Sequence, residues 1–229
     1  MEIRLSTKMS VLNIFIAGGR IIDDKANVGG QLFLDTQDMR QKFGIEGITH
    51  IARSSGIYLD PRDNMEVTDI NDVPDHISQS DIVFLAIPPN KDSEMRYINM
   101  AQQHNVPIIT AAKEAPAYHW DQLKDMENVG IRATAGGNSG ILPFAAENVR
   151  PDPRKVQYFV AVVNGTLNDI FTNRKDYNGD AEALNARVKK LGLAEKGDGT
   201  LVDTMNGEIR DVALKTAILF NVAGFSDKI

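Results

Sequence analysis

Short apolar runs that alternate with helical patterns constrain the fold of this chain more than any other feature. The runs with strand character are 11–17 (VLNIFIA), 48–52 (ITHIA), 81–87 (DIVFLAI) and 106–110 (VPIIT). A partial helical stripe covers 31–43, and a fuller one covers 92–103. Buried strands separated by helices predict a parallel sheet with right-handed crossover connections, which binds ligands beyond the carboxyl ends of its strands. We therefore predict an α/β fold here.

The pattern changes after about residue 130. A glycine-rich stretch, 134–140 (TAGGNSG), precedes 156–163 (VQYFVAVV), which is the most strand-like run in the chain. Helical patterns follow at 181–191 and 209–222, and Gly192 is a natural stop for the first of them. We therefore expect a second domain that contains both helices and strands.

The length of 229 residues allows one large core or two modest ones. We place the boundary so that 1–135 form the α/β domain and 136–229 form an α+β domain.

Composition excludes several classes of function. A net charge of −6 and a pI near 5.2 argue against a nucleic-acid partner, because that binding needs clustered Lys and Arg. The absence of cysteine excludes disulfides and thiolate zinc sites, and four histidines leave little for a transition metal. No apolar run approaches the ~20 residues that span a bilayer, and residues 1–10 lack the apolar core of a secretory signal. We therefore expect a cytoplasmic protein with a small-molecule partner and no membrane association.

The first candidate site is the glycine cluster after 11–17. Gly18, with Asn27, Val28 and Gly29, could bring backbone N–H groups to a pyrophosphate at a helix N-terminus. A dinucleotide fingerprint has about four residues between its first and third glycines. Here ten residues, including Asp23 and Asp24, separate Gly18 from Gly29. A surface loop without a ligand is therefore the alternative interpretation.

After the second strand candidate, 48–52, the chain continues with Arg53-Ser54-Ser55. Sites that prefer NAD usually place an acidic residue here to bind the ribose diol, whereas an arginine and a hydroxyl suit a 2′-phosphate. The residues favour NADP over NAD, and a solvated surface arginine is the alternative.

Asp211 and Lys215 form a candidate pair for proton transfer. They are four residues apart, so on a helix they share one face. Oxidation of an alcohol needs a base that removes the hydroxyl proton, and a lysine can serve if its surroundings lower its pKa. From the spacing alone, a surface ion pair is the favoured interpretation.

Read together, the segments resemble the homoserine dehydrogenase family, particularly the dehydrogenase domain of bifunctional aspartokinase–homoserine dehydrogenases. Near the start, 13–18 (NIFIAG), 27–32 (NVGGQL) and 51–60 (IARSSGIYLD) carry the likeness. Further matches are 109–115 (ITAAKEA) to "TANK-A", 134–143 to the "VGGGIP" loop, 163–171 (VNGTLNDIF) to "NGTxNYI", 191–201 (LGLAEKGDGTL) to "LGYAEADPTL" and 211–219 (DVALKTAIL) to "DAARKLAIL". The matches keep their order across almost the whole chain.

The resemblance implies a Rossmann-like NAD(P)-binding domain, a catalytic domain whose sheet mediates a homodimer, and a place in threonine and methionine biosynthesis. The implied reaction is hydride transfer between NADP or NAD and C4 of L-homoserine, which interconverts homoserine and aspartate 4-semialdehyde. Lys215 is the implied acid/base lysine, and Lys113 a second lysine near the substrate and cofactor.

The implied substrate-binding residues lie in the second domain. Glu195 and Asp211 would hold the ammonium and hydroxyl ends of the amino-acid substrate. Asn164, Gly165 and Thr166 would line the junction of substrate and cofactor. The backbone of Ala135, Gly137 and Gly140 would hold a monovalent cation such as sodium.

Several departures from the family pattern support a second hypothesis. The first loop is lengthened, the segment 206–211 (NGEIRD) is longer than the family's EGWD, and the catalytic domain is expected to be truncated after Ile229. The alternative is a catalytically degenerate or truncated relative that binds a ligand or a partner. A dehydrogenase acting on a related small amino acid is a third possibility.

Overall fold

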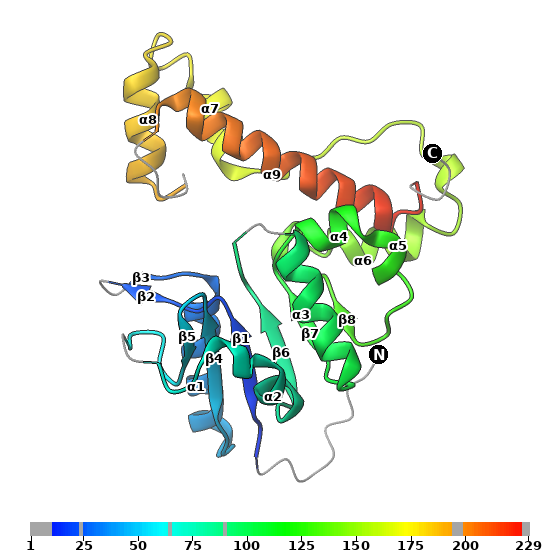
Figure 1. The fold of residues 1–229 in the computed structure, drawn as a ribbon. Coiled ribbons are helices and arrows are strands. Elements are labelled where there is room, and N and C mark those ends of the chain that lie inside the picture. The colour runs from blue at the N-terminus through cyan, green and yellow to red at the C-terminus, as the bar shows by residue number, and fades with distance from the viewer. Residues whose placement is uncertain (1–10, 23–24, 64–65, 89–90, 194–198, 226–229) are drawn as a thin grey trace. The chain divides into compact units, whose positions relative to one another are not determined.

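The computed structural model describes residues 11–22, 25–63, 66–88, 91–193 and 199–225. The chain divides into two compact units, Met1–Thr134 and Ala135–Ile229 (Figure 1).

The first unit contains a six-stranded sheet in the order β5-β4-β1-β6-β7-β8. Its strands are β1 (Ile14–Ala17), β4 (Thr49–Arg53), β5 (Gly56–Tyr58), β6 (Ile82–Leu85), β7 (Ile108–Thr110) and β8 (Val129–Gly130). The β4–β5 pair is antiparallel, and all other pairs are parallel. The predicted α/β fold with a Rossmann-like parallel sheet is therefore confirmed.

Alternate residues of β1 explain how the sheet is buried on both faces. Ile14 and Ile16 join an apolar cluster that contains Phe33 of α1 (Val28–Phe43), whereas Phe15 and Ala17 join the cluster on the other face. The second cluster is covered by α2 (Val73–Ser78), α3 (Lys91–Gln103), α4 (Glu114–Tyr118) and α5 (Trp120–Leu123). Because both faces are covered, the strands appear in the sequence as continuous apolar runs.

Helix α1 begins three residues before the predicted stripe at 31–43. The Asn27 side chain accepts a hydrogen bond from the Gly30 N–H and caps the helix. At the other end, Gly44 adopts the left-handed conformation with φ of 64°.

A histidine pair in the first unit predicts sensitivity to acid. The rings of His50 on β4 and His76 on α2 lie 4.3 Å apart, and burial, with a contribution from the His76 charge, lowers the pKa of His50. The folded state therefore disfavours protonated His50, and the stability present above the ordinary pKa near 6.5 is lost as the pH falls through the lowered value.

We expect the urea midpoint of the first unit to fall between about pH 7 and about pH 5. Fluorescence of Trp120, the only tryptophan in the chain, reports the unfolding of this unit. His50→Gln should reduce the fall, whereas His104→Gln, at an exposed site, should not. Equal pH dependence in wild type and His50→Gln would show that another group is responsible.

Helices form the regular structure described in the second unit: α6 (Ile141–Phe144), α7 (Gly165–Asn173), α8 (Ala181–Lys190) and α9 (Leu201–Val222), with the short turns η2 (Gly137–Ser139), η3 (Ala145–Val149) and η4 (Pro153–Lys155). Helices α7, α8 and α9 pack on one another. A bidentate ion pair from Arg187 on α8 to Asp169 on α7, at 2.9 and 3.0 Å, joins two of them and lowers the pKa of Asp169.

The predicted helices at 181–191 and 209–222 are present, and α9 starts eight residues earlier than expected because Thr200 and Asp203 form a capping box.

The predicted strand at 156–163 is wrong. The segment forms no strand, and Tyr158, Val160 and Val162 are 82%, 83% and 76% exposed. A strand needs a neighbour that pairs with its backbone N–H and C=O groups. Within the described part of the second unit there is no other strand to supply one.

In the described part of the chain, no helix combines the length and the apolar character that crossing a membrane requires.

Candidate functional site

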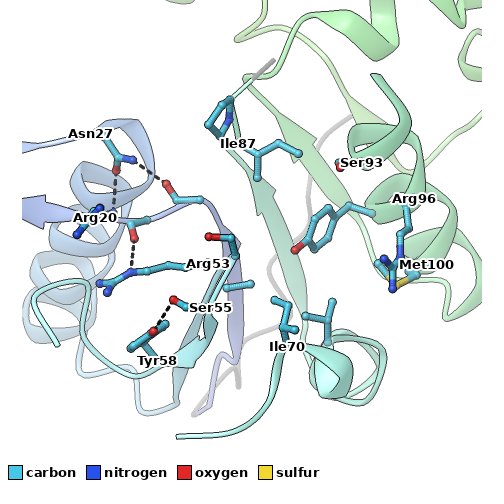
Figure 2. Close-up of a pocket in the computed structure, with 17 residues that line it drawn as sticks. Arg20, Asn27, Arg53, Ser55, Tyr58, Ile70, Ile87, Ser93, Arg96 and Met100 are labelled. Carbon is cyan, nitrogen blue, oxygen red and sulfur yellow. Dashed lines mark hydrogen bonds between the residues drawn. The ribbon is translucent and has the colours of Figure 1, made fainter. Parts of the chain in front are cut away.

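A cavity of about 650 Å³ opens in the first unit beyond the carboxyl ends of β1, β4 and β6 (Figure 2). The last residue of β4, Arg53, lines the cavity. The segments after the three strands contribute Gly18, Gly19, Arg20, Ser54, Ser55, Ile87 and Pro88. Helix α3 contributes Ser93, Arg96 and Met100 on the opposite side. Tyr97 of the same helix also lines the cavity. Because β4 and β6 flank β1 on its two sides, the cavity lies where the strand order of the sheet reverses, which is the usual ligand site of such a sheet.

The lengthened loop between Gly18 and Gly29 is folded into a hairpin. Its strands β2 (Ile21–Ile22) and β3 (Lys25–Ala26) pair antiparallel, and the Asn27 N–H donates to the Arg20 carbonyl at 3.0 Å. A Cβ added at Gly29 would lie 2.8 Å from the Gly18 carbonyl oxygen, so the two glycines are in direct contact. The hairpin thus accommodates the extra residues while the ends of the loop meet. Asp23 and Asp24 lie outside the described residues.

The side chain of Asn27 closes this turn. Its Nδ2 donates to the Gly18 carbonyl at 2.8 Å, and its Oδ1 accepts from the N–H groups of Arg20 and Gly30 at 2.9 and 2.8 Å. Gly18 itself has φ of +96°, and an added Cβ would lie 2.4 Å from the Ala86 carbonyl oxygen. The turn therefore requires glycine at this position and an amide at position 27.

Arg53 connects the turn after β1 to the segment after β5. Its Nε donates to the Gly19 carbonyl at 3.0 Å, its Nη1 donates to the Asp63 carbonyl at 2.6 Å, and its Nη2 donates to the Pro61 carbonyl. The guanidinium also stacks 4.2 Å above the ring of Tyr58. Three of its five N–H groups are thus bound to the protein's own backbone.

The lining of the cavity suits a dinucleotide. Three arginines, at 20, 53 and 96, and the hydroxyls of Ser54 and Ser55 can bind phosphate oxygens, and no described lining residue is acidic. Ile70, Val73, Met100 and the ring of Tyr97 offer an apolar surface for a flat base. Burial raises the pKa of Tyr97 against the opposing Arg96 charge, so its phenol stays neutral near pH 7. The residues present therefore fit a nicotinamide dinucleotide.

Two predicted cofactor residues and Lys113 lie outside the lining of the cavity. Val28 is 59% exposed, and Gly29 starts α1 against the turn after β1. Lys113 lies in the first unit, between β7 and α4, at the N-cap position of α4. Gly18, Asn27, Arg53 and Ser54 do line the cavity.

Replacing Asn27 with alanine should weaken cofactor binding. The substitution removes the helix cap and the two other hydrogen bonds that hold the turn, which should destabilise the first unit by about 1–2 kcal/mol. We expect the Kd for NADPH, measured by fluorescence titration, to rise by roughly tenfold. Gln31→Ala, an exposed position one turn into α1, is the control. An unchanged Kd in Asn27→Ala would show that the ligand does not depend on this turn.

The second unit brings Asn164, Asp211 and Lys215 together. The Nζ of Lys215 lies 2.6 Å from Asp211 Oδ2 and donates to the Val163 carbonyl at 2.9 Å. Asn164 Nδ2 donates to Asp211 Oδ2 at 3.1 Å, and Asn164 Oδ1 caps α7 by accepting from the Leu167 N–H. The side chains of Lys215 and Asp211 are only 18% and 21% exposed. The pair is therefore shielded from solvent more than an ordinary surface ion pair.

Glu208 belongs to this cluster and was not among the residues predicted from the sequence. Its Oε2 accepts a hydrogen bond from Asn164 Nδ2. On α9 it precedes Asp211 by three residues, which places both on one face of the helix. That spacing is visible in the sequence once the helix is known to begin at Leu201.

The other predicted substrate residues lie at the start of α7 or outside the described residues. Thr166 is buried, and its Oγ1 donates to the Leu193 carbonyl at 2.6 Å. Gly165 is the first residue of α7, and a Cβ added there would meet no heavy atom within 4 Å. Glu195 lies outside the described residues.

The predicted cation loop opens the second unit. Ala135 is buried, and Gly137 and Gly140 adopt left-handed φ angles of 52° and 76°. Among the described side chains of the whole chain, no group of three or more His, Cys, Asp or Glu could hold a metal ion. A site made of backbone carbonyls is a different type, and it stays a prediction.

Comparison with solved structures shows the fold of homoserine dehydrogenases. A hyperthermophilic archaeal homoserine dehydrogenase in complex with NADPH is 19% identical, with a TM-score of 0.60 over 93% of this chain and 70% of that one. The enzyme of Thermoplasma acidophilum is 19% identical, with a TM-score of 0.65 over 92% and 68%. That of Thiobacillus denitrificans is 18% identical, with a TM-score of 0.62 over 93% of this chain and 49% of the other.

No family model matches the chain, and no curated protein matches it in sequence.

Proposed function

We propose that this chain is an NAD(P)-dependent homoserine dehydrogenase, which interconverts L-homoserine and L-aspartate 4-semialdehyde. The contact of Lys215 with Asp211, which in turn accepts a hydrogen bond from Asn164, carries the proposal, because it provides a shielded proton-transfer group in the segments that resemble the family's catalytic motifs. The cavity in the first unit supports it by fitting a dinucleotide. The fold shared with homoserine dehydrogenases, one of them in complex with NADPH, supports it as well.

Each side chain of the cluster has a distinct part in the proposed reaction. A nicotinamide dinucleotide would be held by the lining of the cavity in the first unit, including Arg20, Arg53 and Arg96, and would supply the hydride chemistry at C4 of homoserine. Lys215 donates a proton to the carbonyl oxygen of aspartate semialdehyde as the hydride arrives, and takes the proton back from the homoserine hydroxyl in the reverse direction. Asp211 holds the lysine Nζ in place, and Asn164 orients Asp211.

The remaining residues predicted from the sequence have supporting parts in the same proposal. Glu195 and Asp211 bind the substrate, Lys113 lies near the substrate and the cofactor, and Gly165 and Thr166 line their junction. The three arginines of the cavity favour NADP over NAD, since each can bind a 2′-phosphate.

Further parts of the proposal concern the setting of the enzyme. We propose a cytoplasmic homodimer, with a monovalent cation on the backbone of 135–140, in threonine and methionine biosynthesis. The proposal also includes kinship with the dehydrogenase domain of the bifunctional aspartokinase enzymes, which the motifs in the sequence resemble.

A titration followed by turnover tests the proposal. The purified chain is titrated with NADPH and with NADH by fluorescence, and aspartate semialdehyde is then added while cofactor absorbance is followed. We expect saturable binding, tighter for NADPH, and oxidation of the cofactor after substrate is added. Binding without turnover for this substrate would favour a dehydrogenase for a related amino acid, and no binding of either cofactor would favour a non-catalytic relative.

A further inference from the structure

The amide of Asn164 is shared by two carboxylates. Its Nδ2 group donates one hydrogen bond to Asp211 and one to Glu208, while its Oδ1 is held by the Leu167 N–H at 2.8 Å. Asn164 is only 8% exposed, so the cap of α7 fixes the direction in which its NH₂ group points. Glu208 and Asp211 are thereby drawn to the same point.

The charges of this cluster are unequal. Among the described contacts of the cluster, Glu208 and Asp211 bring two negative charges, and Lys215, which contacts Asp211, brings one positive charge. Within the described part of the chain, only Oε2 of Glu208 has a hydrogen-bond partner, so Oε1 keeps its acceptor capacity. Glu208 is partly buried, where a cation would be attracted more strongly than at a fully exposed carboxylate.

Asp211 and Glu208 therefore have different surroundings. Asp211 contacts the lysine ammonium at 2.6 Å, whereas Glu208 contacts the neutral amide. A second ammonium brought to the cluster would balance its charge best at Glu208. L-Homoserine carries such a group on C2, two carbons away from the reacting C4.

We propose that Glu208 binds the α-ammonium group of the substrate and so selects amino acids over hydroxy acids that lack it. This assignment rests on the proposed function. It adds to Glu195 a second substrate carboxylate, one that lies on the same face of α9 as Asp211 and close to Lys215 in the sequence.

The test uses L-homoserine and 4-hydroxybutanoate, which has the hydroxyl and the carboxylate but no ammonium group. Glu208→Gln removes the charge while its amide oxygen can still accept from Asn164, so the position of Asn164 is kept. Glu147→Gln, at an exposed site in η3 of the same unit, is the matched control. Circular dichroism melts verify that each variant is folded.

We expect Glu208→Gln to raise the KM for L-homoserine by about 10- to 100-fold, the effect of losing a hydrogen bond between charged groups, with a much smaller change in kcat. The inhibition constant of 4-hydroxybutanoate against L-homoserine should be unchanged. Glu147→Gln should behave as wild type.

Three results would overturn the assignment. An unchanged KM for L-homoserine in Glu208→Gln would show that the carboxylate does not meet the substrate. An equal loss for homoserine and 4-hydroxybutanoate would show that Glu208 acts only by positioning Asn164. A wild-type chain that neither binds nor oxidises homoserine would reject the proposed function together with this assignment, whereas the first two results leave the function intact.

Discussion

Lys215→Ala should lower the rate of hydride transfer by about 10²- to 10⁴-fold and leave the second unit folded. The lysine Nζ is the proposed proton donor and acceptor, and the pair with Asp211 positions it at 2.6 Å. Removing it leaves Asp211 bonded to Asn164 but without its ammonium partner, so the expected loss of stability is about 1–3 kcal/mol. Stopped-flow measurement of NADPH oxidation gives the rate, and circular dichroism gives the stability.

Lys190→Ala is the matched control for this substitution. Lys190 is an exposed lysine in the last turn of α8, in the same unit. It should retain wild-type turnover. Normal turnover in Lys215→Ala would remove the lysine from the proposed mechanism, and equal losses in both variants would point to a general effect of removing a positive charge.

Gly18→Ala should destabilise the first unit by about 2–5 kcal/mol. The residue has φ of +96°, which costs an L-residue roughly 1–2 kcal/mol, and the new Cβ would lie 2.4 Å from a backbone oxygen, an overlap worth another 1–3 kcal/mol. The oxygen belongs to Ala86, directly after β6, so relief of the overlap must move the main chain of the central sheet. Urea unfolding monitored by Trp120 measures the loss, and NADPH binding should disappear with it.

Gly44→Ala separates the two contributions. Gly44 also has positive φ, at 64°, but a Cβ added there meets nothing within 4 Å. It should cost about 1 kcal/mol, the conformational part alone. Similar losses in the two variants would show that the close approach of Gly18 to β6 contributes nothing.

Four strands of the sheet could be predicted because a strand that is buried on both faces consists almost entirely of apolar residues. β1, β4, β6 and β7 appear as apolar runs in the sequence, and each is present near its expected position. β8 has only two residues, and β5, which pairs antiparallel with β4, has three. Both strands are too short to show a periodicity. Neither carries a local signal.

Properties that depend on distant residues could not be predicted. The spacing of Gly18 and Gly29 left a surface loop as an alternative to a phosphate turn, because counting residues does not show that the β2–β3 hairpin returns the chain to its starting point. The run 156–163 has strand composition, yet a strand also depends on a partner whose presence its own residues cannot reveal.

Part of the candidate site could likewise be predicted from the sequence, and part could not. Asp211 and Lys215 could be paired from helical spacing, and the structure places them 2.6 Å apart. Glu208 could not be placed with this pair from the sequence. The segment 206–211 was compared with a shorter motif and interpreted as an insertion. The early start of α9 places that segment inside the helix, so Glu208 faces the same way as Asp211.

Transfer of deuterium tests the proposed reaction most directly. The purified chain is incubated with L-aspartate 4-semialdehyde and NADPH that is dideuterated at C4 of its nicotinamide, and the amino-acid product is analysed by mass spectrometry. The account predicts homoserine that carries a single deuterium at C4. Homoserine without deuterium, or no homoserine at all, would contradict it.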